Sequence, residues 1–232
     1  MTDVAANWQQ VCDQAAAAAL RAGRDPESVR IIAVSKTKPI EMIAQAIAAG
    51  ATDIGENYVQ EAAPKIHRIT APVTWHMIGH LQRNKAGRAV ELFDVIHTLD
   101  GVPLGLALAR RGEQRGRPVR VLIEVNTGGE ASKSGVAPAE VARMLTALAA
   151  QPGLLIEGLM TVPPVATSAQ AVRPHFRTLR ELRARLQSGA SANAPLRELS
   201  MGMSDDFTVA IEEGATMVRI GRAIFGEREA RQ

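Results

Sequence analysis

Lys36 is the residue of this sequence with the clearest potential for chemistry. It follows a run of small and β-branched residues (31–35), and a helical pattern opens after it at Pro39. Such a run is typical of a buried parallel strand, so we expect the lysine at the carboxyl end of the first strand. α/β barrels keep their chemistry at that end, and a partly desolvated lysine can form a Schiff base with an aldehyde. The alternative is a solvated lysine at a strand end, the commoner environment of this residue type.

Two later segments, which follow the seventh and eighth expected strands, could bind a phosphate group. Residues 200–204 read Ser-Met-Gly-Met-Ser, and residues 219–222 read Arg-Ile-Gly-Arg. In a barrel, the loops after the last two strands are the usual phosphate site. Ser200 and Ser204 offer hydroxyl groups, glycines let backbone N–H groups approach an anion, and a short helix over 222–226 would point its N-terminus at that anion. The alternative is ordinary turn chemistry with helix caps.

A lysine together with a phosphate site indicates an aldehyde that carries a phosphate, and pyridoxal 5′-phosphate (PLP) fits this description. Arg219 ends a buried strand and would lie inside the site. A guanidinium only donates hydrogen bonds, so opposite the pyridine nitrogen it would leave that nitrogen unprotonated and weaken the ring as an electron sink. Its alternative role is a salt bridge to Glu124 or Glu198. The residues expected to contact the cofactor are Lys36, Asn57, Ser200, Met201, Gly202, Arg219, Gly221 and Arg222.

The elements that must position these residues alternate between strand and helix along the chain. After an N-terminal helix (3–22), we predict strands at 31–35, 53–55, 73–78, 95–97, 119–125, 155–159, 198–200 and 217–220. Helices are predicted at 39–49, from 57, and at 82–90, 102–113, 138–149, 172–186 and 205–213. About eight βα units allow a (β/α)8 TIM barrel or an open doubly wound sheet. No Gly-x-Gly-x-x-Gly turn follows the first strand, which favours the barrel, as a single α/β domain over residues 1–232.

The composition restricts the classes of protein to which the chain can belong. Of its 232 residues, 46% are hydrophobic but only 3% are aromatic, so the core must be aliphatic and base stacking with nucleic acid is not expected. The net charge is +3, and the arginine-rich stretches 110–117 and 177–185 are interpreted as solvated helix faces. Cys12 is the single cysteine, and no metal-binding spacing is visible, since His76 and His80 do not share a helix face. Without a signal peptide or a membrane-spanning stretch, a cytoplasmic protein is expected.

Seven segments, in order over nearly the whole chain, closely resemble the pyridoxal 5′-phosphate homeostasis protein family. They are residues 33–39, 55–61, 75–85, 125–126 with 132–135, 158–160, 199–206, and 218–221 with 224–226. The first reads Ala-Val-Ser-Lys-Thr-Lys-Pro and the second Gly-Glu-Asn-Tyr-Val-Gln-Glu. One departure is Thr-Leu-Asp at 98–100, where Ser-Val-Asp is expected, and it affects only a local loop.

The resemblance implies a fold like the N-terminal barrel of alanine racemase, with PLP held as a Schiff base on Lys36. It also implies phosphate contacts near Ser200 and Gly221, with Arg219 facing the pyridine ring. Proteins of this family are mostly regarded as PLP carriers or as regulators of vitamin B6 and amino-acid pools, without an established catalytic reaction. PLP-dependent apoenzymes are then candidate recipients. A monomer is expected because no long exposed apolar stripe stands out.

A PLP-dependent amino-acid racemase is the main alternative function. Alanine racemases add a second domain and use a tyrosine as the base on the opposite face. This chain ends at Gln232, just after the eighth βα unit, and its one tyrosine, Tyr58, is predicted on a helix. A base on one face cannot easily return a proton to the other, so slow or no turnover is expected. A third hypothesis is a sugar-phosphate enzyme that forms its Schiff base on Lys36 without a cofactor.

Overall fold

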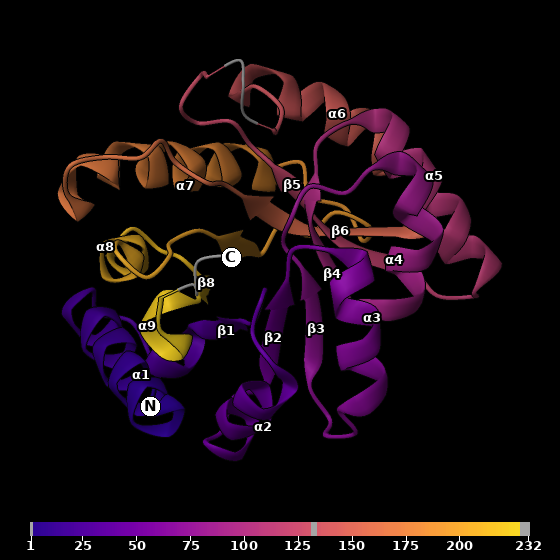
Figure 1. Ribbon diagram of the computed structural model, residues 1–232. Coiled ribbons are helices and arrows are strands. Elements are labelled where there is room, and N and C mark those ends of the chain that lie inside the picture. The colour runs from indigo at the N-terminus through magenta and orange to yellow at the C-terminus, as the bar shows by residue number, and fades with distance from the viewer. Residues whose placement is uncertain (1, 131–133, 228–232) are drawn as a thin grey trace.

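The computed structural model describes residues 2–130 and 134–227, which form a closed barrel of parallel strands surrounded by helices (Figure 1). The strands are β1 (Arg30–Val34), β2 (Asp53–Glu56), β3 (Thr74–Met77), β4 (Val95–Leu99), β5 (Val119–Glu124), β6 (Leu154–Met160), β7 (Glu198–Ser200) and β8 (Met217–Ile220). The α-helices are α1 (Val4–Arg21), α2 (Ile40–Ala48), α3 (Val59–Arg68), α4 (Ala86–Leu92), α5 (Val102–Gln114), α6 (Val141–Leu148), α7 (Arg173–Gln187), α8 (Phe207–Glu212) and α9 (Arg222–Phe225).

The first strand closes the barrel, because β1 pairs with β2 on one side and with β8 on the other. In an open doubly wound sheet, β1 and β8 would not form part of one continuous ring. The predicted (β/α)8 barrel with an extra N-terminal helix is therefore confirmed. Because every neighbouring pair is parallel, the carboxyl ends of all the strands lie at one end of the barrel.

Aliphatic side chains build the core, as the low aromatic content requires. Every residue of β2, β4 and β8 is buried. The N-terminal helix α1 contributes Ala15, Ala18 and Ala19, whose small side chains let it lie close against α2, α8 and α9 (Figure 1). Asp3 caps this helix by accepting a hydrogen bond from the N–H of Ala6 at 3.0 Å.

No helix within residues 2–130 and 134–227 is long and apolar enough to span a bilayer.

The segment after the second strand differs from its sequence prediction. β2 extends through Glu56, because the buried carboxylate of this residue accepts a hydrogen bond from Lys65 at 2.7 Å and so tolerates a strand position inside the protein. α3 begins at Val59 and not at Asn57. Tyr58 is the N-cap residue of that helix, so the prediction that placed it on the helix was wrong by one residue.

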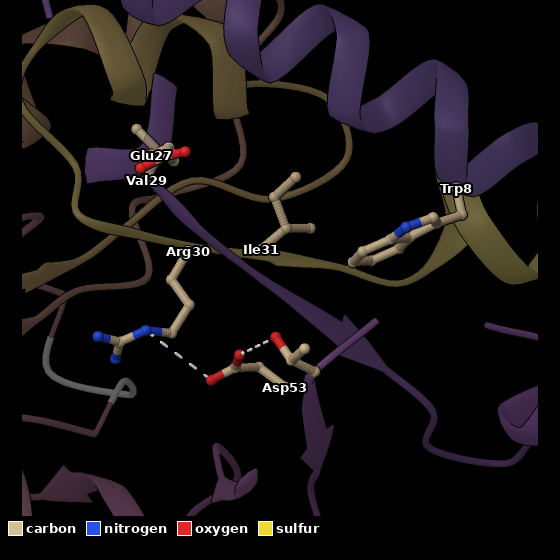
Figure 2. A pocket seen from close by; sticks show the side chains of 7 residues that line it. Trp8, Glu27, Val29, Arg30, Ile31 and Asp53 are labelled. Carbon is tan, nitrogen blue, oxygen red and sulfur yellow. Dashed lines mark hydrogen bonds and ion pairs between the residues drawn. The ribbon is translucent and has the colours of Figure 1, made fainter. Parts of the chain in front are cut away.

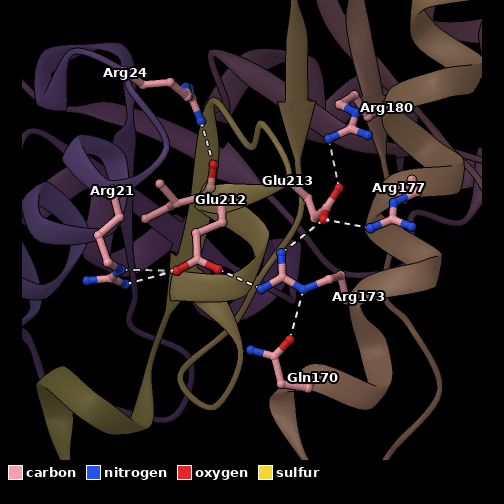
Figure 3. Close-up of polar contacts among 9 residues, drawn as sticks. Arg21, Arg24, Gln170, Arg173, Arg177, Arg180, Glu212 and Glu213 are labelled. Carbon is pink, nitrogen blue, oxygen red and sulfur yellow. Dashed lines mark hydrogen bonds and ion pairs between the residues drawn. The ribbon is translucent and has the colours of Figure 1, made fainter.

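An ion-pair cluster joins α7 to the end of α8 on the outside of the barrel (Figure 3). Glu213 has a buried carboxylate, which accepts hydrogen bonds from Arg173 at 2.9 Å and Arg180 at 2.7 Å and pairs with Arg177 at 3.4 Å. The stretch 177–185, interpreted from the sequence as a solvated face, therefore supplies two arginines to a structural contact. Because several charges share one buried carboxylate, the cluster is worth more than an isolated surface pair.

We predict that Glu213→Ala lowers the free energy of unfolding by about 2 kcal/mol, because three arginines lose the buried carboxylate that they share. The loss stays below that of a fully buried pair because the arginines are partly exposed. Glu91→Ala, which breaks the exposed pair between Arg88 and Glu91, is the control and should cost less than about 0.5 kcal/mol. Urea unfolding measures both values, and equal values for the two variants would contradict a stabilising role of the cluster.

Candidate functional site

Three of the residues singled out in the sequence follow adjacent strands, at the carboxyl end of the barrel. Lys36 is half-buried in the turn after β1, Asn57 follows β2, and Gly221 follows β8. The strands β2 and β8 flank β1. A Cβ atom at Gly221 would lie 3.4 Å from the carbonyl oxygen of Val34, so the two backbones are in close contact there. The structure thus brings Lys36 and Gly221 to neighbouring positions at the carboxyl end of the barrel.

The residue before Lys36 is tied to a buried ion pair. Nζ of Lys65 donates to the carbonyl oxygen of Ser35 at 2.9 Å and to Oε1 of Glu56 at 2.7 Å, and the hydroxyl of Ser35 donates to the same carboxylate oxygen at 2.6 Å. Burial raises the pKa of Glu56, and the hydrogen bonds from Lys65 and Ser35 oppose this effect. A buried charge is tolerated only when it is paired, so this ion pair holds the end of β1 in one place.

The residue after Lys36 is tied to the same ion pair. Lys65 also contacts Glu61 at 2.7 Å, and the carboxylate of Glu61 accepts a hydrogen bond from the backbone N–H of Thr37. Thr37 has a φ of 64°, in the left-handed region that a β-branched residue rarely adopts. Sequence analysis did not identify this network. Its one available signal is the i,i+4 spacing of Glu61 and Lys65, which is common on helix surfaces.

Arg219 is buried inside the barrel and is held by neutral acceptors. Nη1 donates to Oγ of Ser200 at 2.6 Å, and Nη2 donates to the carbonyl oxygen of Thr161 at 2.8 Å. Burial lowers the pKa of Arg219 to about 10, so the guanidinium stays protonated at neutral pH. Glu198, considered from the sequence as a salt-bridge partner, pairs with Arg30 at 3.7 Å.

The loop after β7 is arranged differently from a simple row of phosphate-binding hydroxyls. Ser200 is fully buried and its hydroxyl contacts Arg219, so the side chain points into the barrel. Met201 is buried as well, and its N–H donates to a carbonyl of β8 at 3.1 Å. Gly202 has a φ of 95°, and a Cβ there would lie 2.5 Å from the Cβ of Ala210, so this turn requires glycine.

Comparison with known proteins identifies the family. Residues 4–229 match the alanine racemase N-terminal domain. The chain is 42% identical over 233 residues to the pyridoxal phosphate homeostasis protein of Escherichia coli K12, covering 99% of this chain and 98% of that protein. It is also 42% identical over 235 residues to the protein of the same name from Vibrio alginolyticus, covering 99% of both. The chain belongs to the pyridoxal phosphate homeostasis protein family.

A solved relative of this homeostasis-family chain contains the cofactor. PipY from Synechococcus elongatus, whose structure has PLP bound, superposes with a TM-score of 0.81 at 37% sequence identity, covering 93% of this chain and 100% of PipY. The likeness extends over the whole PipY chain, so the barrel described here is the fold of both proteins. Of the segments that resemble the family, residues 132 and 133 lie outside the described residues.

Arg222 of the homeostasis-family barrel is already engaged by carboxylates. Its guanidinium pairs with Asp205 and with Glu227, the latter at 3.2 Å, and the hydrogen bond to Asp205 raises the pKa of Arg222. The side chain is about half exposed. Close by, the backbone N–H of Ala223 donates to the hydroxyl of Ser204 at 3.3 Å. Both the arginine side chain and the N–H of Ala223 at the beginning of α9 therefore already have partners within the protein.

A cleft of about 360 Å³ opens at the carboxyl ends of β2 and β3. Asn57, Tyr58, Met77 and His80 are among the residues that line it. The Oδ1 atom of Asn57 is buried and has no hydrogen-bond partner among the residues that the structure describes. Such a polar atom is costly unless a ligand or water reaches it, so Asn57 presents a ready contact for a bound molecule. Tyr58 is largely exposed at the rim.

Glu124, the last residue of β5, carries a buried carboxyl group. Its Oε2 atom has no hydrogen-bond partner within the described part of the chain. Burial, assisted by the charge of Asp100, raises the pKa of Glu124 from 4.5 to about 7, and the charge of Arg219 opposes this shift. The folded protein therefore keeps Glu124 protonated at pH values where the unfolded chain has released the proton. Across residues 2–130 and 134–227, no group of three or more His, Cys, Asp or Glu residues could hold a metal ion.

We predict that Glu124 makes stability fall as the pH rises. Because its folded-state pKa is raised, the folded form binds more protons between about pH 4.5 and 7, so the contribution of this group is present at low pH and lost above 7. The change corresponds to about 3 kcal/mol. Relative to Glu124→Gln, the native protein should lose about that much between pH 5 and 8 in urea unfolding of the ligand-free proteins. A difference between the native protein and Glu124→Gln that stays constant over this pH range would contradict the shift.

Proposed function

We propose that this chain binds PLP at the carboxyl end of its barrel, holds it as a Schiff base on Lys36, and serves PLP and amino-acid balance as a non-catalytic cytoplasmic carrier. The names of its relatives and the PLP-bound structure of PipY support the binding. The single observation that carries the proposal is that Lys36 follows β1, while Arg219 lies on the adjacent strand β8 and Gly221 follows that strand. PLP-dependent apoenzymes are the proposed recipients of the cofactor.

The described residues fit this cofactor. Gly202 and Gly221 lie in the loops after β7 and β8, where the phosphate is proposed to bind, and Gly221 directly precedes α9. Asn57 offers an amide without a partner for its oxygen within the described residues, and an amide can donate as well as accept. When bound, PLP would supply an electrophilic aldehyde carbon and a conjugated ring.

Lys36 would hold the cofactor through its side-chain amine. The deprotonated Nζ would serve as the nucleophile for the aldehyde carbon, and its two protons would leave with the carbonyl oxygen as water. Ser35 and Thr37, which flank the lysine, are both tied to the Lys65 ion pair, so the backbone that carries the amine is fixed before the ligand arrives. This preorganisation lowers the conformational cost of binding.

The properties of Arg219 favour a protein that holds PLP over one that uses PLP in catalysis. It is buried, protonated and able only to donate, so opposite the pyridine nitrogen it would keep that nitrogen unprotonated. An unprotonated ring withdraws electrons weakly, which disfavours removal of a proton from a bound amino acid. Tyr58, the single tyrosine, lies exposed at the start of α3.

We predict a visible absorption band from the protein loaded with PLP, which borohydride reduction fixes as a stable adduct on Lys36, located by peptide mass mapping. Lys36→Ala should lose the adduct, because no amine remains at that position. Lys38→Ala is the matched control and should keep it, since Lys38 Nζ contacts the carbonyl oxygen of Glu227 at 2.8 Å. A protein that stays colourless with added PLP would overturn the proposal.

A racemase assay on the PLP-loaded native protein and on Lys36→Ala decides the racemase alternative. Interconversion of D- and L-alanine that Lys36→Ala abolishes would show that the chain is an enzyme, and the non-catalytic role would then be wrong. Turnover absent from the PLP-loaded protein supports the carrier role.

We predict that Arg219→Ala keeps the borohydride-fixed adduct but shifts the absorption maximum of bound PLP, because the ring nitrogen loses its donor. Arg88→Ala, on the exposed face of α4, should leave the spectrum unchanged. The spectra of the two variants, recorded at saturating PLP, provide the measurement. An unshifted band in Arg219→Ala would remove this arginine from the site.

A further inference from the structure

A continuous chain of hydrogen bonds crosses the interior of the barrel. Its links are Asp53 Oδ1 to His76 Nε2 at 2.8 Å, His76 Nδ1 to His97 Nε2 at 2.9 Å, His97 Nδ1 to Ser200 Oγ at 2.9 Å, and Ser200 Oγ to Arg219 Nη1 at 2.6 Å. All five side chains are buried. They come from β2, β3, β4, β7 and β8, so the chain runs between strands far apart in the ring.

The two ends of this chain fix its direction. The guanidinium of Arg219 can only donate, and the carboxylate of Asp53 can only accept. Burial lowers the pKa of His76 and of His97, so each imidazole is neutral and carries one proton. The pKa of Asp53 is lowered as well, because its hydrogen bond with His76 and the nearby charges outweigh the effect of burial. Each neutral imidazole between the two ends therefore donates once and accepts once, and the hydroxyl of Ser200 has one proton to donate.

One arrangement of protons satisfies every link. His76 must donate its Nε2–H to Asp53, which leaves its Nδ1 as an acceptor. His97 must then donate its Nε2–H to His76, which leaves its own Nδ1 as an acceptor. The hydroxyl of Ser200 donates to His97, and its oxygen lone pair faces Arg219. The reversed direction would place an unprotonated Nε2 of His76 against a carboxylate oxygen, where two acceptors would meet.

Asp53 lies at the opposite end of the barrel from Lys36, because it is the first residue of β2. There it lines a cleft of about 310 Å³ with Arg30, whose Nε lies 3.9 Å from Oδ1 (Figure 2). The hydroxyl of Thr52 donates to Oδ2 at 2.8 Å, leaving Oδ1 to His76. The charges of Arg30 and Arg120 act on both histidines and disfavour their protonation.

We propose that Asp53, His76 and His97 are positioning residues for Arg219, which they reach through Ser200. The chain orients the Ser200 oxygen as an acceptor for Nη1, and together with the Thr161 carbonyl at Nη2 it prevents the guanidinium from rotating. A carboxylate at the amino-terminal end of the barrel thus controls the donor at the ligand end. The effect of this positioning on bound PLP rests on the proposed function, in which Arg219 faces the pyridine ring. The arrangement of protons along the chain does not depend on the proposed function.

The proton arrangement is tested by ¹⁵N NMR of the histidine rings in the full-length protein without PLP. Both His76 and His97 should be neutral with the proton on Nε2, assigned with His76→Gln and His97→Gln. A proton on Nδ1 of either ring, or a cationic ring at neutral pH, would overturn the inference. This readout is independent of any cofactor, so the proposed function can fail while the inference stands.

The positioning role is tested with Asp53→Asn at saturating PLP. An amide can donate to His76, so the chain is free to reverse, and the absorption maximum of bound PLP should shift although residue 53 lies outside the ligand site. Glu198→Gln is the matched control: it removes an acid that also pairs with Arg30 at this end but belongs to no link of the chain, and it should cause no shift. Asp53→Asn without a shift, or an equal shift in both variants, would overturn the positioning role.

Discussion

The ion pair between Lys65 and Glu56 is the interaction on which the geometry of the site depends. A lysine inside a protein needs its charge satisfied, and here two carboxylates and one backbone carbonyl surround Nζ at 2.7 to 2.9 Å. Removing one partner of a buried pair typically costs about 3–5 kcal/mol, because the other charge is left without compensation. The same atoms hold the residues on both sides of Lys36. The stability of β1, β2 and α3 is therefore coupled to the position of the amine.

Buried polar groups inside the barrel must also have hydrogen-bond partners. Barrel interiors are usually filled by layers of branched aliphatic side chains. This one contains an arginine, two histidines and a serine, each of which would destabilise the core if a donor or acceptor were left unsatisfied. Their single consistent direction of hydrogen bonding removes that penalty. It also makes the interior rigid, because no member can rotate without breaking two links.

The fold could be predicted from the sequence because its signals are local. Runs of β-branched residues, helix periodicity and the residues at helix ends depend only on neighbours in the chain, and the closed barrel followed from their number. The positions of Lys36 and Gly221 were predictable for the same reason, since the loops after parallel strands all lie at one end of the barrel. That these residues contact PLP in this chain stays a prediction, which the loading and reduction experiments address.

The contacts that organise the site could not be predicted, because they join distant segments. His76 and His97 are 21 residues apart, and Ser200 is 103 residues from His97. The face of a strand on which a side chain lies depends on the register of the closed ring. The sequence analysis expected the hydroxyl of Ser200 to be available to a phosphate, but in the structure this hydroxyl contacts Arg219. The pairing of Arg222 with Asp205 has a similar origin, because two loops meet there only after the barrel has closed.

Hydrogen bonds to neutral acceptors, rather than a salt bridge to the acid at the far end of the hydrogen-bond chain, hold Arg219 in place. The acid at the far end of the chain is separated from the guanidinium by two neutral imidazoles and a hydroxyl, so the direct Coulomb attraction between the two charges falls with that separation. Neutral acceptors leave the positive charge of the arginine to be offset only through space, by the nearby carboxyl groups of Glu124 and Asp206. A buried cation that keeps its charge, and whose hydrogen bonds within the described chain go to neutral oxygens, suits the proposed role, in which Arg219 would attract anionic PLP and keep its ring nitrogen unprotonated. A carboxylate in that position would do the opposite, by stabilising a proton on the ring nitrogen.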